Sequence, residues 1–163
     1  MIEEKIKWNK KYKTFTPTRP NELLKHIPNA KNKKALDLAG GPGINAEVLI
    51  SKGYDVTLID ISDVAISKIK NPDIKTFCLD LDTYIIPQNE FDVIIMIKYF
   101  NLDLLKQIPK ALKSGGYFIF ETIEKYPVDK KLFFELFKNF DIIRFSEKPF
   151  QFVGVKRGCN RTV

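Results

Sequence analysis

Short apolar runs alternate with amphipathic segments along most of the chain. The near-continuous apolar run Phe91–Ile97 is typical of a strand buried on both faces of a sheet. Four apolar residues of Asp129–Lys138 recur at helical spacing, which predicts an amphipathic helix there. The other predicted strands are Ala35–Ala39, Asp55–Asp60, Ile74–Leu79, Tyr117–Glu121, Asp141–Phe145 and Phe150–Lys156. The other predicted helices are Glu3–Lys13, Glu22–His26, Asn45–Lys52, Val64–Lys70 and Leu102–Lys113.

The order of these elements predicts an α/β fold. Five strand–helix units imply a mostly parallel sheet of seven strands with helices on both faces. The last two strands follow each other without room for a helix, so they form a terminal antiparallel hairpin. We expect a single domain over 1–163, with an N-terminal helical cap (1–33), an α/β core (34–156) and a tail (157–163).

Composition narrows the class of protein. The chain is 44% hydrophobic, which excludes intrinsic disorder. Its longest apolar runs, Phe91–Ile97 and Tyr117–Phe120, fall short of the roughly 20 residues that span a bilayer. The charged stretch Met1–Lys13 lacks the apolar region of a secretory signal. We therefore expect a soluble cytoplasmic protein that does not bind a membrane.

The net charge of +7 is concentrated at the two ends of the chain. Residues 1–34 carry 10 Lys and Arg against 3 Asp and Glu, and residues 144–163 carry 5 against 1. This distribution favours an anionic partner such as RNA, but a solvated lysine-rich surface explains it better. Only 4 of the 27 basic residues are Arg, the residue that phosphate recognition favours.

The candidate site lies where the strands end, because ligands of open α/β sheets bind beyond the carboxyl ends of the strands. The first strand runs into Gly40–Gly43, in which Gly41 and Gly43 permit a tight turn and close approach of a ligand. The second ends at Asp60, where a carboxylate can accept hydrogen bonds from both hydroxyls of a ribose. Asp37 would repel a pyrophosphate and suits a ligand with a cationic group. Together they predict an adenosine-type ligand.

The sequence lacks the motifs that several other functions require. Ala46 stands where a dinucleotide fingerprint needs glycine, and no Gly-Lys-Ser/Thr of a P-loop occurs. There is no His/Cys cluster, so we expect no metal site. A Gly-x-Ser-x-Gly nucleophile elbow is also missing. The single histidine, His26, stands before a proline at the end of a short helix, which is typical of a capping or exposed residue.

These residues resemble the class I S-adenosylmethionine-dependent methyltransferases, and most closely the small tellurite-resistance-type branch. The resemblance rests on Ala35–Ala46 and Gly53–Ser62, with further likeness in Phe91–Ile95, Tyr99–Asn101 and Ala111–Gly116. It implies a Rossmann-like fold and S-adenosyl-L-methionine as the methyl donor. Gly40 and Ile44 stand where that branch has Cys and Arg, so the methyl acceptor does not follow from the resemblance.

The resemblance also implies residues for the adenosine part of the donor. Asp60 would hold the ribose hydroxyls, and Ile61 would pack on the adenine. Asp80 would accept a hydrogen bond from the adenine amino group, and the N–H of Leu81 would meet a ring nitrogen.

A second implied set concerns the methionine part of the donor. Asp37 would act on the amino group, and the backbone of Ala39, Gly41 and Gly43 would contact the methionine. Lys98 would lie near the sulfonium. The aromatic residues of the N-terminal segment, Trp8 and Tyr12, would close over the donor.

The candidate catalytic residues are Tyr99 and Glu121, at the ends of the fourth and fifth strands. A general base is needed only if the acceptor is protonated in its reactive state. The alternatives are core packing for Tyr99, and a capping role or a pairing with a lysine for Glu121.

The function that follows is methyl transfer to a small molecule or a protein side chain. Two alternatives stay open: an RNA methyltransferase, suggested by the basic N-terminal segment, and a non-catalytic S-adenosylmethionine-binding partner subunit, suggested by the short C-terminal part. We expect a monomer or a homodimer, because the terminal hairpin leaves an edge that can pair with a second copy.

Overall fold

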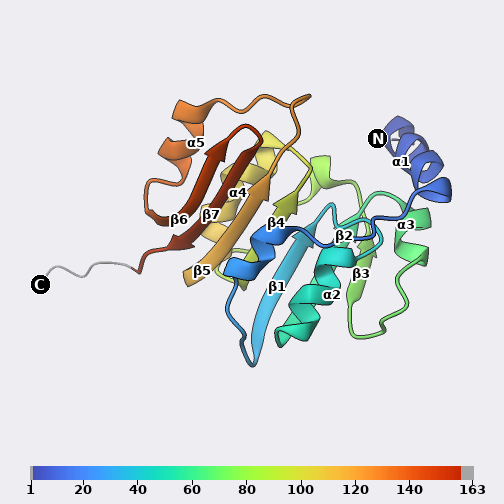
Figure 1. Cartoon of the computed structure of the whole chain (residues 1–163), viewed down its shortest axis with the longest axis horizontal. Helices are drawn as coiled ribbons and strands as arrows, with labels where there is room; N and C mark the ends of the chain where they lie inside the picture. Colours follow the sequence, from blue (N-terminus) through green and yellow to red (C-terminus); the bar gives the residue numbers. More distant parts are fainter. Residues whose placement is uncertain (1, 159–163) are drawn as a thin grey trace, which may run out of the picture.

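A seven-stranded sheet forms the centre of the molecule in the computed structural model, which describes residues 2–158 (Figure 1). Its strand order is β3-β2-β1-β4-β5-β7-β6. The strands are β1 (Lys33–Leu38), β2 (Tyr54–Asp60), β3 (Lys75–Cys78), β4 (Phe91–Ile97), β5 (Leu112–Glu121), β6 (Phe140–Glu147) and β7 (Phe150–Lys156). β7 runs antiparallel to both β5 and β6, and the other pairs are parallel. The predicted α/β fold with its terminal hairpin is confirmed.

Helices pack on both faces of this sheet. They are α1 (Ile2–Thr14), α2 (Ile44–Ser51), α3 (Asp63–Ser67), α4 (Leu102–Ala111) and α5 (Lys130–Leu136), with the 3-10 helices η1 (Glu22–His26) and η2 (Leu81–Thr83). η1 and α2 cover one face, and α4 and α5 cover the other, since they belong to two separate clusters of buried residues. Consecutive residues of β4 alternate between the clusters: Val93 and Ile95 in one, Ile94 and Met96 in the other. Burial on both faces explains the continuous apolar run that predicted this strand.

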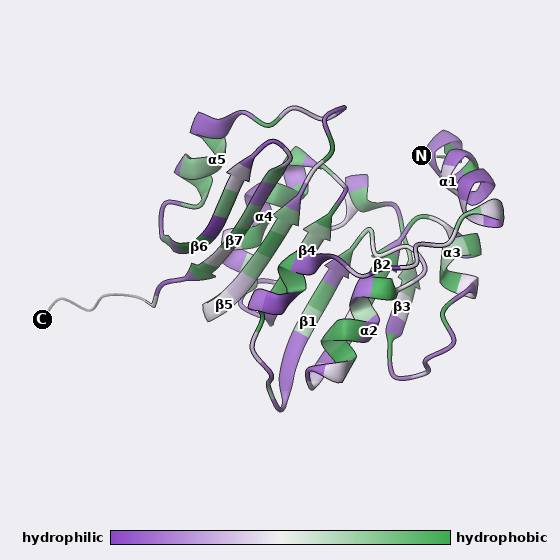
Figure 2. Ribbon diagram, viewed as in Figure 1, coloured by the Kyte–Doolittle hydropathy of each residue, from purple (hydrophilic) through white to green (hydrophobic). Residues whose placement is uncertain are grey.

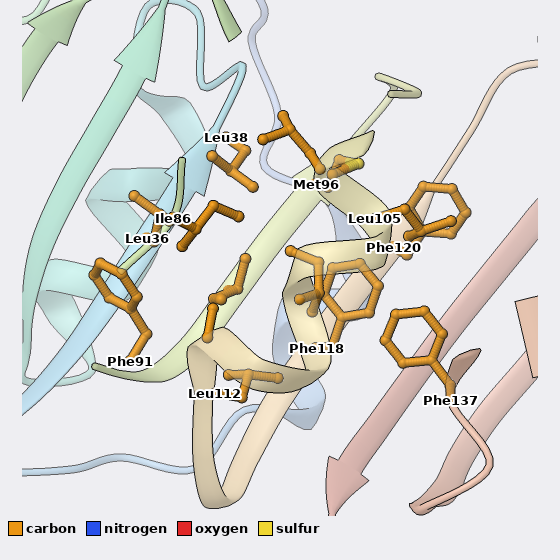
Figure 3. Packing of buried hydrophobic residues seen from close by; sticks show 14 of the residues in the cluster. Leu36, Leu38, Ile86, Phe91, Met96, Leu105, Leu112, Phe118, Phe120 and Phe137 are labelled. Carbon is orange, nitrogen blue, oxygen red and sulfur yellow. The ribbon is translucent and has the colours of Figure 1, made fainter. Parts of the chain in front are cut away.

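Aromatic stacking fills the larger cluster at the C-terminal end of the sheet. The rings of Phe118 and Phe137 stack with centroids 5.0 Å apart, and Phe133 stacks on Phe137 at 4.7 Å. Figure 3 shows Phe118 and Phe137 facing each other between β5 and the segment that follows α5. Offset and tilted ring pairs of this kind stabilise a core beyond the area they bury, so α5 is held firmly against the hairpin.

Most predicted element ends lie within two residues of the observed ones, and the largest differences are at β5 and α3. The helix predicted to reach Lys113 ends at Ala111, and β5 begins at Leu112 and continues through both glycines. Leu112 is already extended, with φ −82° and ψ 139°, and it pairs with Phe91 of β4. The helix predicted over Val64–Lys70 covers only Asp63–Ser67, although its predicted cap is confirmed, because the Ser62 side chain accepts the N–H of Ala65. The pairing of Leu112 with Phe91, which sequence propensity does not contain, sets the end of α4.

The N-terminal helix α1 has no apolar side that is buried against the core. None of its described residues is fully buried, and Ile6 is 62% exposed. α1 is largely hydrophilic and lies beside α3 at one end of the molecule, whereas hydrophobic residues run along β4 and β5 (Figure 2). Asn9 fixes this contact, since its side chain accepts a hydrogen bond from Ser62 Oγ and donates one to Asp63. Polar contacts rather than an apolar stripe therefore dock α1.

Three further predictions concern the edge of the sheet, the C-terminal tail and the membrane. β6 lies at one edge of the sheet with Ile142 and Ile143 about half exposed, and pairing of this edge in a homodimer stays a prediction. The predicted tail 157–163 lies mostly outside the described residues, of which Arg157 and Gly158 are the last. Across residues 2–158, no helix combines the length and the apolar character that crossing a membrane requires.

Candidate active site

A cavity of about 690 Å³ opens at the carboxyl ends of β1, β2 and β4. Its volume lies within the roughly 300–1,000 Å³ of small-molecule sites. Nine of the predicted site residues line it: Trp8, Tyr12, Ala39, Asp60, Ile61, Asp80, Leu81, Lys98 and Tyr99. Four others, Asp37, Gly41, Gly43 and Glu121, do not line it. The topology thus brings most of the predicted set together at the switch in strand order, where β1 lies between β2 and β4.

The glycine turn after β1 forms the floor of the cavity. Gly41 and Gly43 have φ of 57° and 88°, the left-handed region that favours glycine. Ala39 adopts a φ of 58° as well, and it lines the cavity together with Gly40 and Pro42. Gly43 N-caps α2. The turn therefore presents Ala39, Gly40 and Pro42 to the cavity, and contact of Gly41 and Gly43 with a ligand stays a prediction.

Asp60, the predicted ribose ligand, holds this turn in place. Its Oδ2 accepts the N–H of Gly41 at 2.8 Å, and its Oδ1 accepts the N–H of Ser62 at 2.8 Å. Burial raises the pKa of this carboxyl, and its backbone hydrogen bonds act in the opposite direction. Each oxygen retains a second lone pair, so the carboxylate is able to accept further hydrogen bonds from a ligand in the cavity.

Asp37 lies directly beneath the turn and is only 2% exposed. Its Oδ2 has no hydrogen-bond partner among the described residues. Burial raises the pKa of this carboxyl well above its usual range, and the neighbouring charge of Asp60 adds to the effect. A buried acceptor without a donor is costly. A cationic amino group near the turn would supply the missing charge, directly or through a water.

The adenosine end predicted by the resemblance lies after β2 and β3. Ile61 follows Asp60, and Leu81 is buried at the start of η2. Asp80 N-caps this short helix, accepting the N–H of Asp82 at 2.9 Å. All three line the same cavity as Asp60. The arrangement offers a carboxylate and an apolar wall to an adenine-sized ring.

The two predicted lid residues reach the cavity from α1. The rings of Trp8 and Tyr12 stack with centroids 6.0 Å apart, and Trp8 Nε1 donates to Glu4. A Cβ at Gly41 would lie only 2.8 Å from the Tyr12 hydroxyl, so glycine is what allows Tyr12 to rest on the turn. Burial raises the pKa of Tyr12 to about 12, with the charges of Asp60 and Asp37 contributing. Tyr12 therefore stays neutral and covers the acidic part of the site.

The two candidate catalytic residues lie in different surroundings. Tyr99 lines the cavity, and its hydroxyl accepts a hydrogen bond from Asn101 at 3.2 Å. Burial raises the pKa of Tyr99, which disfavours the phenolate that a base would need. Both oxygens of Glu121 accept hydrogen bonds from side-chain amides, Asn21 at 3.2 Å and Gln151 at 2.6 Å. This environment is typical of a carboxylate that links two segments.

The segment between α1 and η1 contributes cavity residues that the sequence analysis did not single out. It lies between two predicted helices, and five of its residues line the cavity: Phe15, Pro17, Arg19, Pro20 and Asn21. Tyr126, from the loop after β5, lines it too. Two prolines between a helix and a capping asparagine indicate an ordered, extended crossing, and this was the available signal. Nothing local in the sequence marked Tyr126.

The residues that the structure describes contain no set of side chains that could bind a metal ion. Within residues 2–158, no three His, Cys, Asp or Glu side chains are grouped so that they could hold an ion. The site is instead built from backbone turns, carboxylates and aromatic rings.

The fold and this cavity define a Rossmann-like enzyme with a site for an adenosine-containing ligand. A family model described as "Methyltransferase domain" matches residues 10–150, most of the chain. The chain therefore belongs to this methyltransferase family, and it is an S-adenosylmethionine-dependent methyltransferase. No curated protein gives a significant match.

Solved structures share the fold at low sequence identity. An S-adenosylmethionine-dependent methyltransferase from Mesorhizobium loti superimposes with a TM-score of 0.62 at 17% identity, over 81% of this chain and 94% of that one. A TehB-like methyltransferase from Corynebacterium glutamicum gives 0.64 at 18%, over 96% of both chains. The phosphoethanolamine N-methyltransferase 2 of Haemonchus contortus gives 0.64 at 16%, over 83% of this chain and 51% of that one.

Proposed function

We propose that this methyltransferase acts on a small-molecule acceptor, with a protein side chain as the second choice, and that it belongs to the tellurite-resistance-type branch. The observation that carries the proposal is the large share of the cavity lining that comes from the N-terminal segment. α1 and the segment 15–21 contribute nine of its lining residues, among them Trp8, Tyr12 and Arg19. A site roofed by its own N-terminal segment suits an acceptor that enters whole. Similarity to the TehB-like structure over 96% of both chains supports the branch.

The proposed roles of the side chains are those that the family resemblance implies, and the positions of these residues support them. S-adenosylmethionine supplies a methyl group that is already activated by its sulfonium. Asp60 would accept from the ribose hydroxyls, with Ile61, Asp80 and Leu81 around the adenine, and Asp37 would balance the ammonium. The main chain of the turn at 39–43 would follow the methionine. Lys98 has a φ of 56°, and in this conformation it would border the sulfonium at the end of β4.

Alignment and exclusion of water are then the main tasks of the protein. The stacked Trp8 and Tyr12 would cover the donor, and the residues 1–33 would act as a cap on the core 34–156. Tyr99 would orient the acceptor through its neutral hydroxyl. Glu121 would fix the cap through Asn21, because both of its oxygens are already engaged by amides.

An RNA acceptor is the second candidate, and one observation favours it. Four exposed lysines of α1, Lys7, Lys10, Lys11 and Lys13, have no carboxylate within 4 Å among residues 2–158. If RNA is the acceptor, the protein should bind RNA tightly at low salt, and this binding should weaken steeply as the salt concentration rises. Binding of a structured RNA that is absent or insensitive to salt would remove this candidate.

Methyl transfer is tested by the formation of S-adenosylhomocysteine. The purified chain would be incubated with methyl-labelled S-adenosylmethionine and separate pools of small metabolites, peptides and RNA, with the Asp60→Asn variant as the matched control. We expect label in the small-molecule pool only, and none with the variant. Label in the peptide pool would assign the second choice, a protein side chain, and label in the RNA pool would contradict the proposed acceptor class. A folded chain that binds the donor but labels nothing would favour the non-catalytic partner subunit.

A further inference from the structure

Charged side chains of both signs line the cavity. Its four carboxylates come from α1 and from the ends of β2 and β3: Glu4, Asp60, Asp80 and Asp82. Arg19, from the crossing segment, and Lys98, at the end of β4, form its basic side. These two segments meet at Glu121, whose carboxylate accepts a hydrogen bond from Asn21 and whose carbonyl oxygen accepts the N–H of Lys98. Asp82 also reaches the loop after β4, where its Oδ1 accepts a hydrogen bond from Asn101 at 3.1 Å.

The two cations on the basic side are not neutralised by the protein. Neither the guanidinium of Arg19 nor the ammonium of Lys98 makes an ion pair or a side-chain hydrogen bond within residues 2–158. Lys11, the third cation of the lining, differs because it lies over the rings of Trp8 and Phe15 at 4.9 and 5.0 Å. The side-chain oxygens of Glu121 accept hydrogen bonds from the amides of Asn21 and Gln151, and from neither cation.

Neither candidate catalytic residue is set up as a general base. Burial raises the pKa of Tyr99, so its hydroxyl stays protonated. Glu121 does not line the cavity. An acceptor that arrives ionised needs no proton removed by these two residues, and it suits a site that contains unpaired cations.

We propose that the acceptor is a small organic anion, carrying a carboxylate or phosphate group that Arg19 and Lys98 bind. This inference rests on the proposed function, because it concerns the same site. The lone pair of the acceptor's nucleophile forms the bond to the methyl carbon, while the carbon–sulfur bond breaks and its electron pair remains on sulfur. The anionic group is held by the planar Arg fork, which matches carboxylate and phosphate oxygens. It also faces the positive sulfonium, so charge attraction orients the acceptor.

The Arg19 position gives a local explanation for a departure noted in the sequence. Ile44 stands where the resembled branch has Arg, and Ile44 lines this cavity together with Arg19. Arg19 reaches the same space from the crossing segment, which Asn21 anchors through its backbone N–H to Asn45 Oδ1 at 2.8 Å. The charge missing from α2 is therefore supplied from the cap.

Binding of a matched pair of probes tests the inference. The protein would first be titrated with S-adenosylhomocysteine, and the saturated protein then with benzoate, benzamide and phenyl phosphate, which differ in charge but share a ring that suits Tyr99 and Tyr126. We expect benzoate or phenyl phosphate to bind at least tenfold more tightly than benzamide. This preference should fall at least tenfold in Arg19→Gln and weaken in Lys98→Gln. It should persist in Lys10→Gln, an exposed α1 lysine outside the cavity lining.

The outcomes separate the inference from the function it rests on. Tighter binding of phenyl phosphate assigns a phosphate acceptor, and tighter binding of benzoate a carboxylate; both support the anion site. Equal binding of benzoate, phenyl phosphate and benzamide, or a preference that survives in both cavity variants, overturns the inference alone. If the folded protein does not bind S-adenosylhomocysteine in the first titration, the proposed function fails and the inference with it.

Discussion

The carboxylate of Asp60, at the end of β2, accepts the backbone N–H of Gly41, in the turn after β1, at 2.8 Å. One side chain thereby ties together the two strand ends that the donor would touch. The same carboxylate accepts the N–H of Ser62, the N-cap of α3, and Ser62 Oγ donates to Asn9 of α1. Turn, carboxylate and cap are thus one connected hydrogen-bond network. A substitution of Asp60 should therefore disturb both the glycine turn and the docking of α1.

Donor binding should release a proton from Asp37. In the free protein, burial and the neighbouring Asp60 raise the pKa of Asp37, and an ammonium beside it would lower that pKa again. Affinity should therefore rise with pH from about pH 4 and level off above the raised pKa. Titrations in two buffers of different ionisation enthalpy would measure the protons released. Asp37→Asn should abolish the buffer dependence; equal heats in both buffers for the native chain would contradict this role.

The same shift has a consequence for the stability of the free protein. Because the folded-state pKa of Asp37 is raised, its contribution to stability is fully present below the unfolded value. That contribution is lost as pH rises through the folded pKa. The free energy of unfolding of Asp37→Asn, taken relative to that of the native chain, should therefore be higher at neutral pH than at acid pH. Denaturant midpoints at the two pH values measure this, and a constant difference would contradict it.

Trp8 should report donor binding directly. It is the single tryptophan of the chain, it lines the cavity and it stacks on Tyr12. A ligand that enters beneath α1 changes the polarity around the indole, so its emission should shift in a saturable way with S-adenosylhomocysteine. Tyr12→Ala should weaken binding several-fold through loss of the cover. An emission spectrum that is unchanged at saturation, as judged by calorimetry, would place the ligand away from α1.

Glu121 should act by positioning the cap rather than by taking a proton. Glu121→Gln keeps the shape but presents an amide to Asn21 or Gln151, so a buried donor loses its acceptor. This costs about 1–3 kcal/mol of stability. We expect a lower melting temperature and faster proteolysis within residues 15–21. In a methyl-transfer assay, KM should rise more than kcat falls, with no change in the pH profile. Loss of an ionisation from that profile would instead identify a base.

Gly53 and Gly115 form a matched pair for testing backbone strain. Both have positive φ, 102° and 81°, and a side chain in that region costs roughly 1–2 kcal/mol. A Cβ at Gly53 would lie 2.0 Å from the carbonyl oxygen of Ala30, whereas one at Gly115 meets nothing within 4 Å. Gly53→Ala should therefore destabilise the chain by clearly more than Gly115→Ala in urea unfolding. Equal losses would mean that the turn before β2 can shift without cost.

The sequence predicted the sheet well because its central strands are buried on both faces, as the run at Phe91–Ile97 illustrates. It predicted the acidic site because strand ends are local features, and Asp37, Gly41 and Asp60 each follow or end an apolar run. The start of β5 was missed because Leu112 is extended only through its pairing with Phe91. The role of Glu121 depends on Asn21, 100 residues away, and no local pattern contains such a partner.

The most direct test of the account is calorimetric titration of the chain with S-adenosylmethionine, repeated with Asp60→Ala and with Asp73→Ala as a control. Asp73 is an exposed aspartate outside the cavity lining. Melting curves of all three would show that they are folded. The account predicts micromolar binding by the native chain, unchanged in Asp73→Ala and at least a hundredfold weaker in folded Asp60→Ala. No binding by the folded native chain, or equal binding by Asp60→Ala, would contradict it.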